Sequence, residues 1–341
     1  MAKEEKTKNI PEEEKSEEKA DINKLLDHEE IIEKPASDAE DYQIAIENAR
    51  LAFQKKFKAG RRNSYIMMAV VLAAAVASVI FITMKATGFK IAGWIIISLA
   101  VVGMLVYYIV TRNTMPHATK EYIALVNKQL NTRNFADPRF TETKTDRDEK
   151  LELADHISDG IYKNLSNIAS RNVVNGQFEG RTFKVGDLGL YSGAGRSRTS
   201  NFVGKYISYP NDLHFEGRYI ITISGATPVD LPSDVEDLTK VIEEDGFVVY
   251  GKEGSKPASD LGKAFMEKVR AIKAEKPLLN LNIVLWGGHC SAYASYEDVI
   301  MTLPFEKPFE KGPNETYVHQ LLDILDAFHL LNKKPSLKKE K

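Results

Sequence analysis

Two long stretches without a charged residue constrain this sequence more than any other feature. Residues 64–84 read SYIMMAVVLAAAVASVIFITM, and residues 91–110 read IAGWIIISLAVVGMLVYYIV. Each has about 20 residues, which as a helix rising about 1.5 Å per residue spans a hydrocarbon layer of about 30 Å. Because unpaired backbone amides are costly in lipid, a crossing segment of this kind has to be helical. The sequence therefore predicts a transmembrane helical hairpin over residues 64–110.

Basic residues beside the two spans indicate how this hairpin is oriented. Five of them precede the first span: Lys55, Lys56, Lys58, Arg61 and Arg62. The linker at residues 85–90 carries only two. Because flanks rich in Lys and Arg stay on the cytoplasmic side, we expect a cell-membrane protein with two spans and both termini in the cytoplasm. The five residues are also candidates for contact with anionic lipid headgroups, although a topology signal alone is the preferred interpretation.

Neither span contains an ionisable residue, so the sequence favours an anchor over a transporter.

The segment ahead of the hairpin is very different. Residues 1–40 carry 14 acidic and 7 basic side chains, whereas the whole chain has a net charge of −2. Such a polar segment buries too little apolar surface to offset its chain entropy, so we expect a disordered acidic arm over residues 1–36. Ser37 and Glu40 then form a capping box that opens an amphipathic juxtamembrane helix over residues 37–63.

The chain after the second span changes character near residue 173. Residues 111–172 have mostly helical spacing, with one apolar stripe made of Leu153, Ile157, Ile161, Leu165 and Ile168. We expect a helical connector there, with Asp155, His156 and Asp159 on its solvated face. From residue 173 to residue 332, short alternating strands are followed by helices over residues 258–273 and 314–332. Strands grouped in this way predict an α+β domain, followed by a basic tail at residues 333–341.

The order of several strand motifs resembles a known family. The motifs are FEGRTFKVGDLGLY, NFVGKYISY and EDGFVVYGKEG, and the residues that carry the likeness are Phe178, Gly180, Phe202, Gly204, Phe247, Val249 and Tyr250. With the membrane hairpin before them, they are similar to the bacterial membrane-protein family catalogued as domain of unknown function 3137. The resemblance covers residues 40–330 and implies a membrane hairpin joined to a strand-rich domain. It implies no catalytic residue, because the family has no assigned activity.

A glycine- and arginine-rich stretch is the strongest candidate for an anion-binding site in the sequence. Gly193 and Gly195 would let backbone amides approach a phosphate, and Arg196 and Arg198 would neutralise it. A dinucleotide fingerprint also needs a third glycine and a following helix, and the lysine of a phosphate-binding loop is missing. An exposed hairpin loop is therefore the preferred interpretation, and a weak anion or lipid-phosphate site is the alternative.

Catalytic and metal-binding constellations are not evident in the sequence. His289 and Cys290 follow a glycine pair that we interpret as a turn between strands at residues 279–286 and 291–302. Adjacent strand residues point to opposite faces, so these two side chains are not expected to meet as a nucleophile and its base. A single cysteine excludes disulfides within the chain and multi-cysteine zinc sites. None of the seven histidines has the spacing of a helical metal pair, so no metal or cofactor is predicted. Aromatic residues are not interleaved with a basic stripe, so nucleic acid is not an expected partner.

The sequence thus predicts a membrane-anchored, cytoplasmic-facing protein without a catalytic residue, whose α+β domain binds a protein or lipid partner. Two alternatives stay open. One is an enzyme that acts on a membrane-associated substrate, with Arg196, Arg198, His289 and Cys290 as its candidate residues. The other is a component of a larger membrane complex that docks through its acidic arm.

Overall fold

The computed structural model describes residues 29–31, 41–146, 149–194, 197–224, 238–272, 278–296, 308–309 and 311–332. The chain divides into two compact units, which we call the helical unit (Lys34–Ala136 and Glu297–His319) and the sheet unit (Met1–Glu33, Asp137–Tyr296 and Gln320–Lys341). Helix α7 (Lys311–Asn332) contributes residues to both. Two long apolar helices followed by a strand-rich domain confirm the predicted α+β class.

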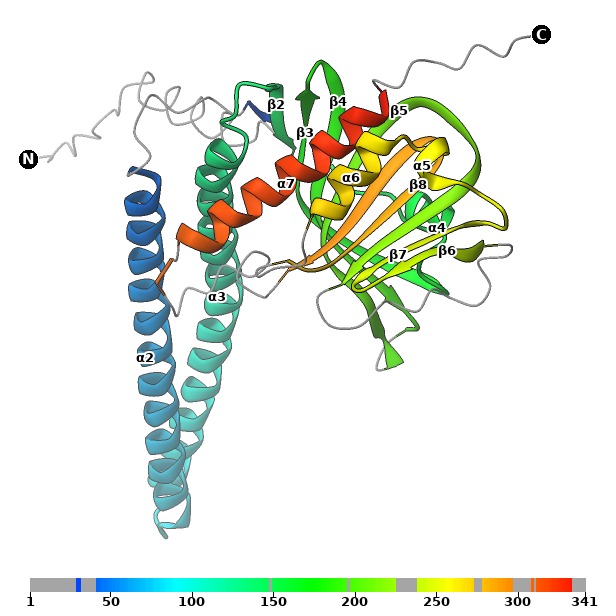
Figure 1. Cartoon of the computed structure of the whole chain (residues 1–341). Helices are drawn as coiled ribbons and strands as arrows, with labels where there is room; N and C mark the ends of the chain where they lie inside the picture. The colour runs from blue at the N-terminus through cyan, green and yellow to red at the C-terminus, as the bar shows by residue number, and fades with distance from the viewer. Residues whose placement is uncertain are drawn as a thin grey trace, which may run out of the picture. The chain divides into compact units, whose positions relative to one another are not determined.

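The helical unit contains two long helices, α2 (Asp41–Thr83) and α3 (Thr87–Asn134), which form an antiparallel hairpin (Figure 1). Both predicted spans lie inside these helices except for Met84, which with residues 85–86 connects them. Each helix is long and apolar enough to cross a membrane, and its apolar side chains are exposed: Leu72 and Leu99 are each 67% accessible. A Cβ added at Gly93 would lie 2.9 Å from the carbonyl oxygen of Ser78, so glycine permits close approach of the helices here.

Both helices continue beyond their apolar stretches. The predicted juxtamembrane helix and the first span form one helix, α2, and α3 likewise runs on without a break to Asn134. Tyr42, Ile46 and Phe53 of α2 pack with Tyr122 and Val126 of α3 in a small buried core. Packing between these apolar faces stabilises the helical conformation of the hairpin outside the predicted spans. The predicted capping box at residues 37–40 lies outside the described residues.

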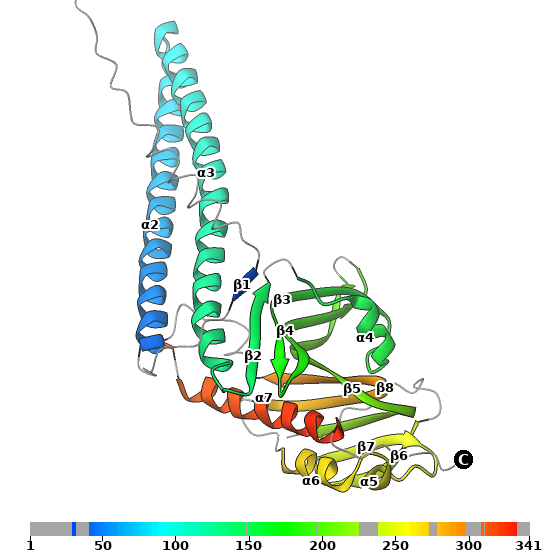
Figure 2. The same cartoon turned by 90° about the horizontal axis from the view of Figure 1, so that it is seen from above.

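The sheet unit is built on one antiparallel sheet. Its strands are β1 (Glu29–Ile31), β2 (Phe140–Asp146), β3 (Leu165–Phe178), β4 (Arg181–Ser192), β5 (Thr199–Ser224), β6 (Leu238–Glu244), β7 (Phe247–Lys252) and β8 (Leu278–Tyr296). Their order is β1-β2-β3-β4-β5-β7-β6, and β8 pairs with the other edge of β5. The long strand β5 therefore organises the sheet, because it pairs with β4, β7 and β8. Helix α4 (Leu153–Asp159) packs on one face (Figure 2).

The predicted helical connector over residues 111–172 is wrong beyond α3, apart from the short helix α4. Residues 140–146 form β2, and β3 begins at Leu165. Helix α4 ends at Gly160, whose φ of 69° lies in the left-handed region that glycine adopts without steric cost. Leu165 and Ile168, which continue the helical stripe in the sequence, belong to β3 and pair with β4. Strand pairing has overridden the local helical spacing here.

Two further predictions about the strands are corrected. The residues Gly287 and Gly288 do not form a turn, because β8 runs without interruption from Leu278 to Tyr296. Gly287, with a φ of 53°, is the register partner of Phe215, between two register shifts of the β5–β8 pair. The glycine thus accommodates a bulge rather than a chain reversal. The acidic arm, predicted to be disordered, contributes the three-residue strand β1, and its other residues lie outside the described ones.

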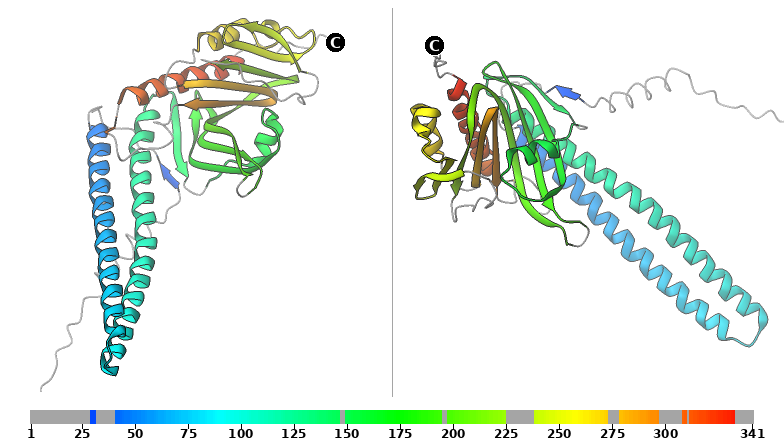
Figure 3. Two further views of the ribbon diagram at one scale, coloured as in Figure 1. Left: turned by 90° about the horizontal axis from the view of Figure 1, so that it is seen from below. Right: turned by 90° about the vertical axis from the view of Figure 1, so that its right-hand side faces the viewer.

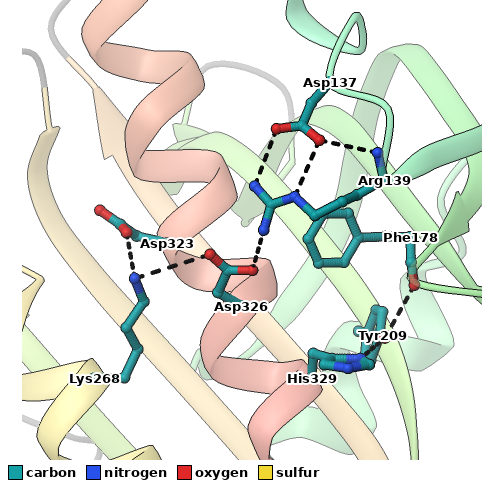
Figure 4. A network of polar contacts seen from close by, with 8 residues as sticks. All are labelled: Asp137, Arg139, Phe178, Tyr209, Lys268, Asp323, Asp326 and His329. Carbon is teal, nitrogen blue, oxygen red and sulfur yellow. Dashed lines mark hydrogen bonds and ion pairs between the residues drawn. The ribbon is translucent and has the colours of Figure 1, made fainter.

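Helices cover the other face of the sheet. Helix α5 (Pro257–Asp260) leads into α6 (Lys263–Ala271), which lies beside the end of α7 (Figure 3). The carboxylate of Asp326 on α7 accepts a 2.6 Å hydrogen bond from Arg139, and Lys268 of α6 lies 2.6 Å from Asp323 (Figure 4). The first ion pair attaches α7 to the turn before β2, and the second joins α7 to α6.

Candidate functional site

An open cleft of about 540 Å³ lies on the sheet unit. Five strands supply its lining: Glu142 and Lys144 from β2; Asn175, Gly176 and Gln177 from β3; Thr182, Phe183 and Lys184 from β4; Ser208 and Pro210 from β5; and His289 from β8. Most of these side chains are polar, and charges of both signs are present. The cleft therefore suits a polar ligand better than an apolar one.

The charged groups along the cleft are held by neighbouring side chains. The amide of Gln177 donates a 2.6 Å hydrogen bond to the carboxylate of Glu142. Lys184 forms an ion pair with Glu149, whose other carboxylate oxygen accepts a hydrogen bond from Asn175. These contacts orient both donors and acceptors toward one region of the sheet, which is the arrangement needed to recognise a hydroxylated or zwitterionic group.

Strand register places further β8 residues on the face of the sheet that carries the cleft. Ser208 of β5 is the register partner of Ser291 on β8, and Tyr206 is the partner of Tyr293. Directly opposite residues of an antiparallel pair point to the same face. Ser291 and Tyr293 consequently lie on the face that carries the cleft, one and two rows beyond the His289 row.

A buried carboxylate lies at that point. Asp159, the last residue of α4, is fully buried. One of its oxygens accepts hydrogen bonds from Tyr293 (2.6 Å) and Ser291 (2.7 Å), and the other accepts one from the indole N–H of Trp286 (2.9 Å). Removing a carboxylate from water is unfavourable unless such donors replace the lost hydration. Three neutral donors from β8 provide that replacement.

His289 connects this carboxylate with the cleft. Its Nε2 atom lies 3.6 Å from Asp159 and 3.5 Å from the hydroxyl of Tyr206, and its side chain is 31% exposed. Among the described residues, His289 is the basic side chain that lies within ion-pair distance of the Asp159 carboxylate. The imidazole therefore lies between a buried negative charge and the open cleft, and a ligand in the cleft would be close to its ring.

The second histidine of the network is fully enclosed. Nδ1 of His156 lies 2.8 Å from the hydroxyl of Tyr293. Because that hydroxyl donates to Asp159, the imidazole must donate from Nδ1, which leaves Nε2 unprotonated. Nε2 is buried and has no hydrogen-bond partner among the described residues. Burial lowers the pKa of His156 to about 4, so the ring is neutral at physiological pH.

The arrangement differs from that of a nucleophilic site. The hydroxyl of Ser291 donates directly to Asp159, while the imidazole of His156 is bonded to Tyr293. A nucleophile needs a base that accepts its own proton, and no such histidine contact is made by Ser291 in the described network. Cys290 is buried, its thiol accepts a hydrogen bond from Asn211, and burial raises its pKa to about 12. The described residues also contain no group of three or more side chains that could hold a metal ion.

The residues of the predicted anion loop are only partly described. Gly193 is exposed with a φ of 77°, and Arg198 places its guanidinium 3.6 Å from the centre of the Tyr191 ring. Gly195 and Arg196 lie outside the described residues. This loop precedes β5, whereas His289 pairs with Pro210 further along that strand. The structure therefore does not bring Arg198 to the cleft.

The predicted juxtamembrane group stays exposed, and the central residues of the network were missed. Lys55, Lys56, Lys58, Arg61 and Arg62 all lie exposed on α2 in the helical unit.

The expectation that Asp159 and His156 face solvent is wrong, since both are fully buried. Their spacing of three residues did place them on one helix face, but such spacing is equally common on solvated helices.

The comparisons with known proteins add a distant structural likeness. No family model matches the sequence, and no curated protein matches it. Among solved structures, the chain is similar to the crystal structure of the mycobacterial trehalose monomycolate transport factor A, TtfA. That similarity has a TM-score of 0.33 and 12% sequence identity, and it covers 55% of this chain and 88% of the other. A likeness at this level carries no argument about function.

Proposed function

We propose that this protein is anchored in the cell membrane by the α2–α3 hairpin and that its sheet unit binds the polar headgroup of a membrane lipid in the cleft. The supporting observation is the cleft itself, which ends at a half-buried histidine backed by the buried carboxylate of Asp159. Such a site combines hydrogen-bond donors and acceptors with charged side chains of both signs. The anchor keeps this site tethered to the bilayer, where headgroups are abundant.

The proposal includes three expectations that come from the sequence. Both termini lie in the cytoplasm, because the basic residues precede the first span. The five juxtamembrane basic residues contact anionic headgroups of the same leaflet. The chain is a member of the bacterial family named above, whose hairpin and strand-rich domain it resembles.

Cysteine labelling in intact cells tests the orientation. Gly88, between the spans, and Glu253, in a turn of the sheet unit, are both exposed, whereas the native Cys290 is buried. We expect Gly88→Cys to react with a membrane-impermeant maleimide in intact cells and Glu253→Cys to react only after permeabilisation. Labelling of Glu253→Cys in intact cells would overturn the proposed orientation.

Lipid retention tests the cleft. The full chain would be purified in detergent, and the bound lipids would be identified by mass spectrometry. Thr182 lines the cleft and is exposed, so Thr182→Trp should fill it without disturbing the core. Glu253→Trp places the same side chain on another exposed position. We expect the wild type and Glu253→Trp to retain one lipid class that Thr182→Trp loses; equal retention by all three would refute a headgroup site in the cleft.

A further inference from the structure

One carboxylate of the cleft comes from an irregularity of strand β2. The register of the β2–β3 pair shifts after Thr141. Two residues of β2, Glu142 and Thr143, lie there opposite a single residue of β3, Gly176. Such a β-bulge changes the direction in which a side chain points. The bulged residue Glu142 lines the cleft.

The backbone of this bulge has an unusual conformation. Glu142 has a φ of 53°, in the left-handed region that residues with a side chain other than Asn and Asp rarely adopt. Gly176 leaves the room that the bulge needs, because an added Cβ would lie 2.8 Å from Cγ2 of Thr143 and 3.0 Å from its Cα. The fold thus keeps Glu142 in an unfavourable backbone conformation beside the cleft, and such conformations cluster at ligand sites.

The Glu142 carboxylate is held by a neutral partner. The amide of Gln177 donates a 2.6 Å hydrogen bond to it, and among the described residues no basic side chain lies within ion-pair distance. The other carboxylate beside the cleft, Glu149, is paired with Lys184. A neutral donor orients a carboxylate without cancelling its charge. Glu142 is therefore the carboxylate that a cationic group of a ligand would meet.

We infer that the headgroup bound in the cleft carries a primary ammonium group, as in an aminophospholipid, and that Glu142 binds this ammonium. The inference rests on the proposed function, because it names the class of headgroup for the same cleft. An ammonium N–H donates a charge-assisted hydrogen bond to a carboxylate. Lys144, from the same strand, also lines the cleft and offers a positive charge to the phosphate of such a headgroup.

The lining of the cleft disfavours a quaternary ammonium such as choline. That group has no N–H to donate, and proteins recognise it with a cage of aromatic rings. The cleft lining includes a single phenyl ring, from Phe183. The same cleft should therefore distinguish ethanolamine from choline headgroups.

Lipid competition on the full chain tests the inference. The chain in detergent would be incubated with equal amounts of phosphatidylethanolamine, phosphatidylcholine and phosphatidylglycerol with the same acyl chains, and bound lipid would be counted by native mass spectrometry. We expect about fivefold more phosphatidylethanolamine than either other lipid. Glu142→Gln keeps the shape of the side chain without its charge, so it should retain all three equally. Glu253→Gln removes an exposed carboxylate elsewhere and should keep the wild-type preference.

A methylation series separates hydrogen bonding from charge. Phosphatidylethanolamine, its N-methyl and N,N-dimethyl forms and phosphatidylcholine all carry a positive nitrogen, but each methyl group removes one N–H donor. Retention by the wild type should fall at each step, because Glu142 binds through those donors. The series needs the wild type alone, so it also tests the inference if Glu142→Gln does not fold.

Several outcomes would contradict the inference. Equal retention of all lipids by the wild type, with their loss from Thr182→Trp, would leave a headgroup site in the cleft but remove the ammonium site. A wild type that retains no lipid would refute the proposed function as well. Binding of phosphoethanolamine in solution without retention of phosphatidylethanolamine would assign the site to a soluble ligand. An unchanged preference in folded Glu142→Gln would show that another group selects the headgroup.

Discussion

Tyr293 donates a 2.6 Å hydrogen bond to the buried carboxylate of Asp159, although 134 residues separate the two in the sequence. This bond joins the end of α4 to the C-terminal part of β8, and the same hydroxyl also contacts His156. The carboxylate is a negative charge inside the sheet unit, and its burial is tolerable only because hydrogen bonds replace its hydration. The network therefore supports α4 and lies behind His289, the residue of this group that lines the cleft.

Removing the carboxylate should strongly destabilise the sheet unit. Asp159→Ala leaves the donors of Trp286, Ser291 and Tyr293 without their acceptor, and we expect the free energy of unfolding to fall by about 3 kcal/mol. Thermal unfolding of the full chain in detergent, followed by tryptophan fluorescence, measures this. Asp155→Ala changes an exposed acid on the same helix and should alter stability by less than about 0.5 kcal/mol. Equal effects of the two substitutions would contradict the assigned role of Asp159.

The stability of the sheet unit should depend on pH through His156. Its pKa is about 4 in the folded chain and about 6.5 when unfolded, so the unfolded state binds more protons between these values. The contribution of His156 to the free energy of unfolding is therefore complete above pH 6.5. The free energy of unfolding falls by about 3 kcal/mol as the pH is lowered from 6.5 to 4.

Unfolding midpoints measured from pH 4 to pH 7.5 would show this dependence. His156→Gln should reduce the slope between pH 4 and 6.5, because the titrating group is gone. His319→Gln, at an exposed position of α7, is the matched control and should retain the slope. An unchanged slope in His156→Gln would show that other groups account for the acid sensitivity.

Arg139 should contribute more stability than an ordinary surface ion pair. It lies 3.0 Å from Asp137 and 2.6 Å from Asp326, and its guanidinium lies 5.1 Å from the ring of Phe178. Because this side chain, in the turn before β2, contacts both α7 and Phe178 of β3, we expect Arg139→Met to lower the free energy of unfolding by about 1 kcal/mol.

Lys240→Met provides the comparison for this prediction. Lys240 pairs with Glu243 at 2.8 Å on a more exposed surface, and its loss should cost less than about 0.5 kcal/mol. Denaturant titration of both variants beside the wild type measures the difference. If Arg139→Met unfolds at the wild-type midpoint, the network in Figure 4 does not hold α7 to the sheet.

Substitution by alanine should affect stability very differently at two glycines of β5. A Cβ at Gly204 would overlap the carbonyl group of Ala294 on β8 and the ring of Phe202, so Gly204→Ala should cost about 3 kcal/mol. A Cβ at Gly217 meets nothing within 4 Å, so Gly217→Ala should be neutral within about 0.5 kcal/mol. Thermal midpoints of the two variants decide this, and a tolerated Gly204→Ala would mean that β5 and β8 are less closely paired.

Much of the architecture could be predicted because it follows from local patterns. The absence of charge over residues 64–84 and 91–110 predicts the two apolar helices directly, since length and hydropathy are properties of a continuous segment. The short apolar run at residues 247–250, bounded by glycines, likewise predicts a strand. The helical connector expected over residues 111–172 is wrong at its end because Leu165 and Ile168 fit a helical stripe locally, while pairing with β4 decides their conformation.

The sequence by itself determined that this protein has a membrane-compatible hairpin and a strand-rich domain, because both depend on the order of apolar and polar residues along the chain. Only the tertiary structure decided the site. Asp159 and His156 look like solvated helix residues until β8 brings Ser291 and Tyr293 against them. That meeting depends on strand register between distant segments, and no local pattern in the sequence specifies which residues a register brings face to face.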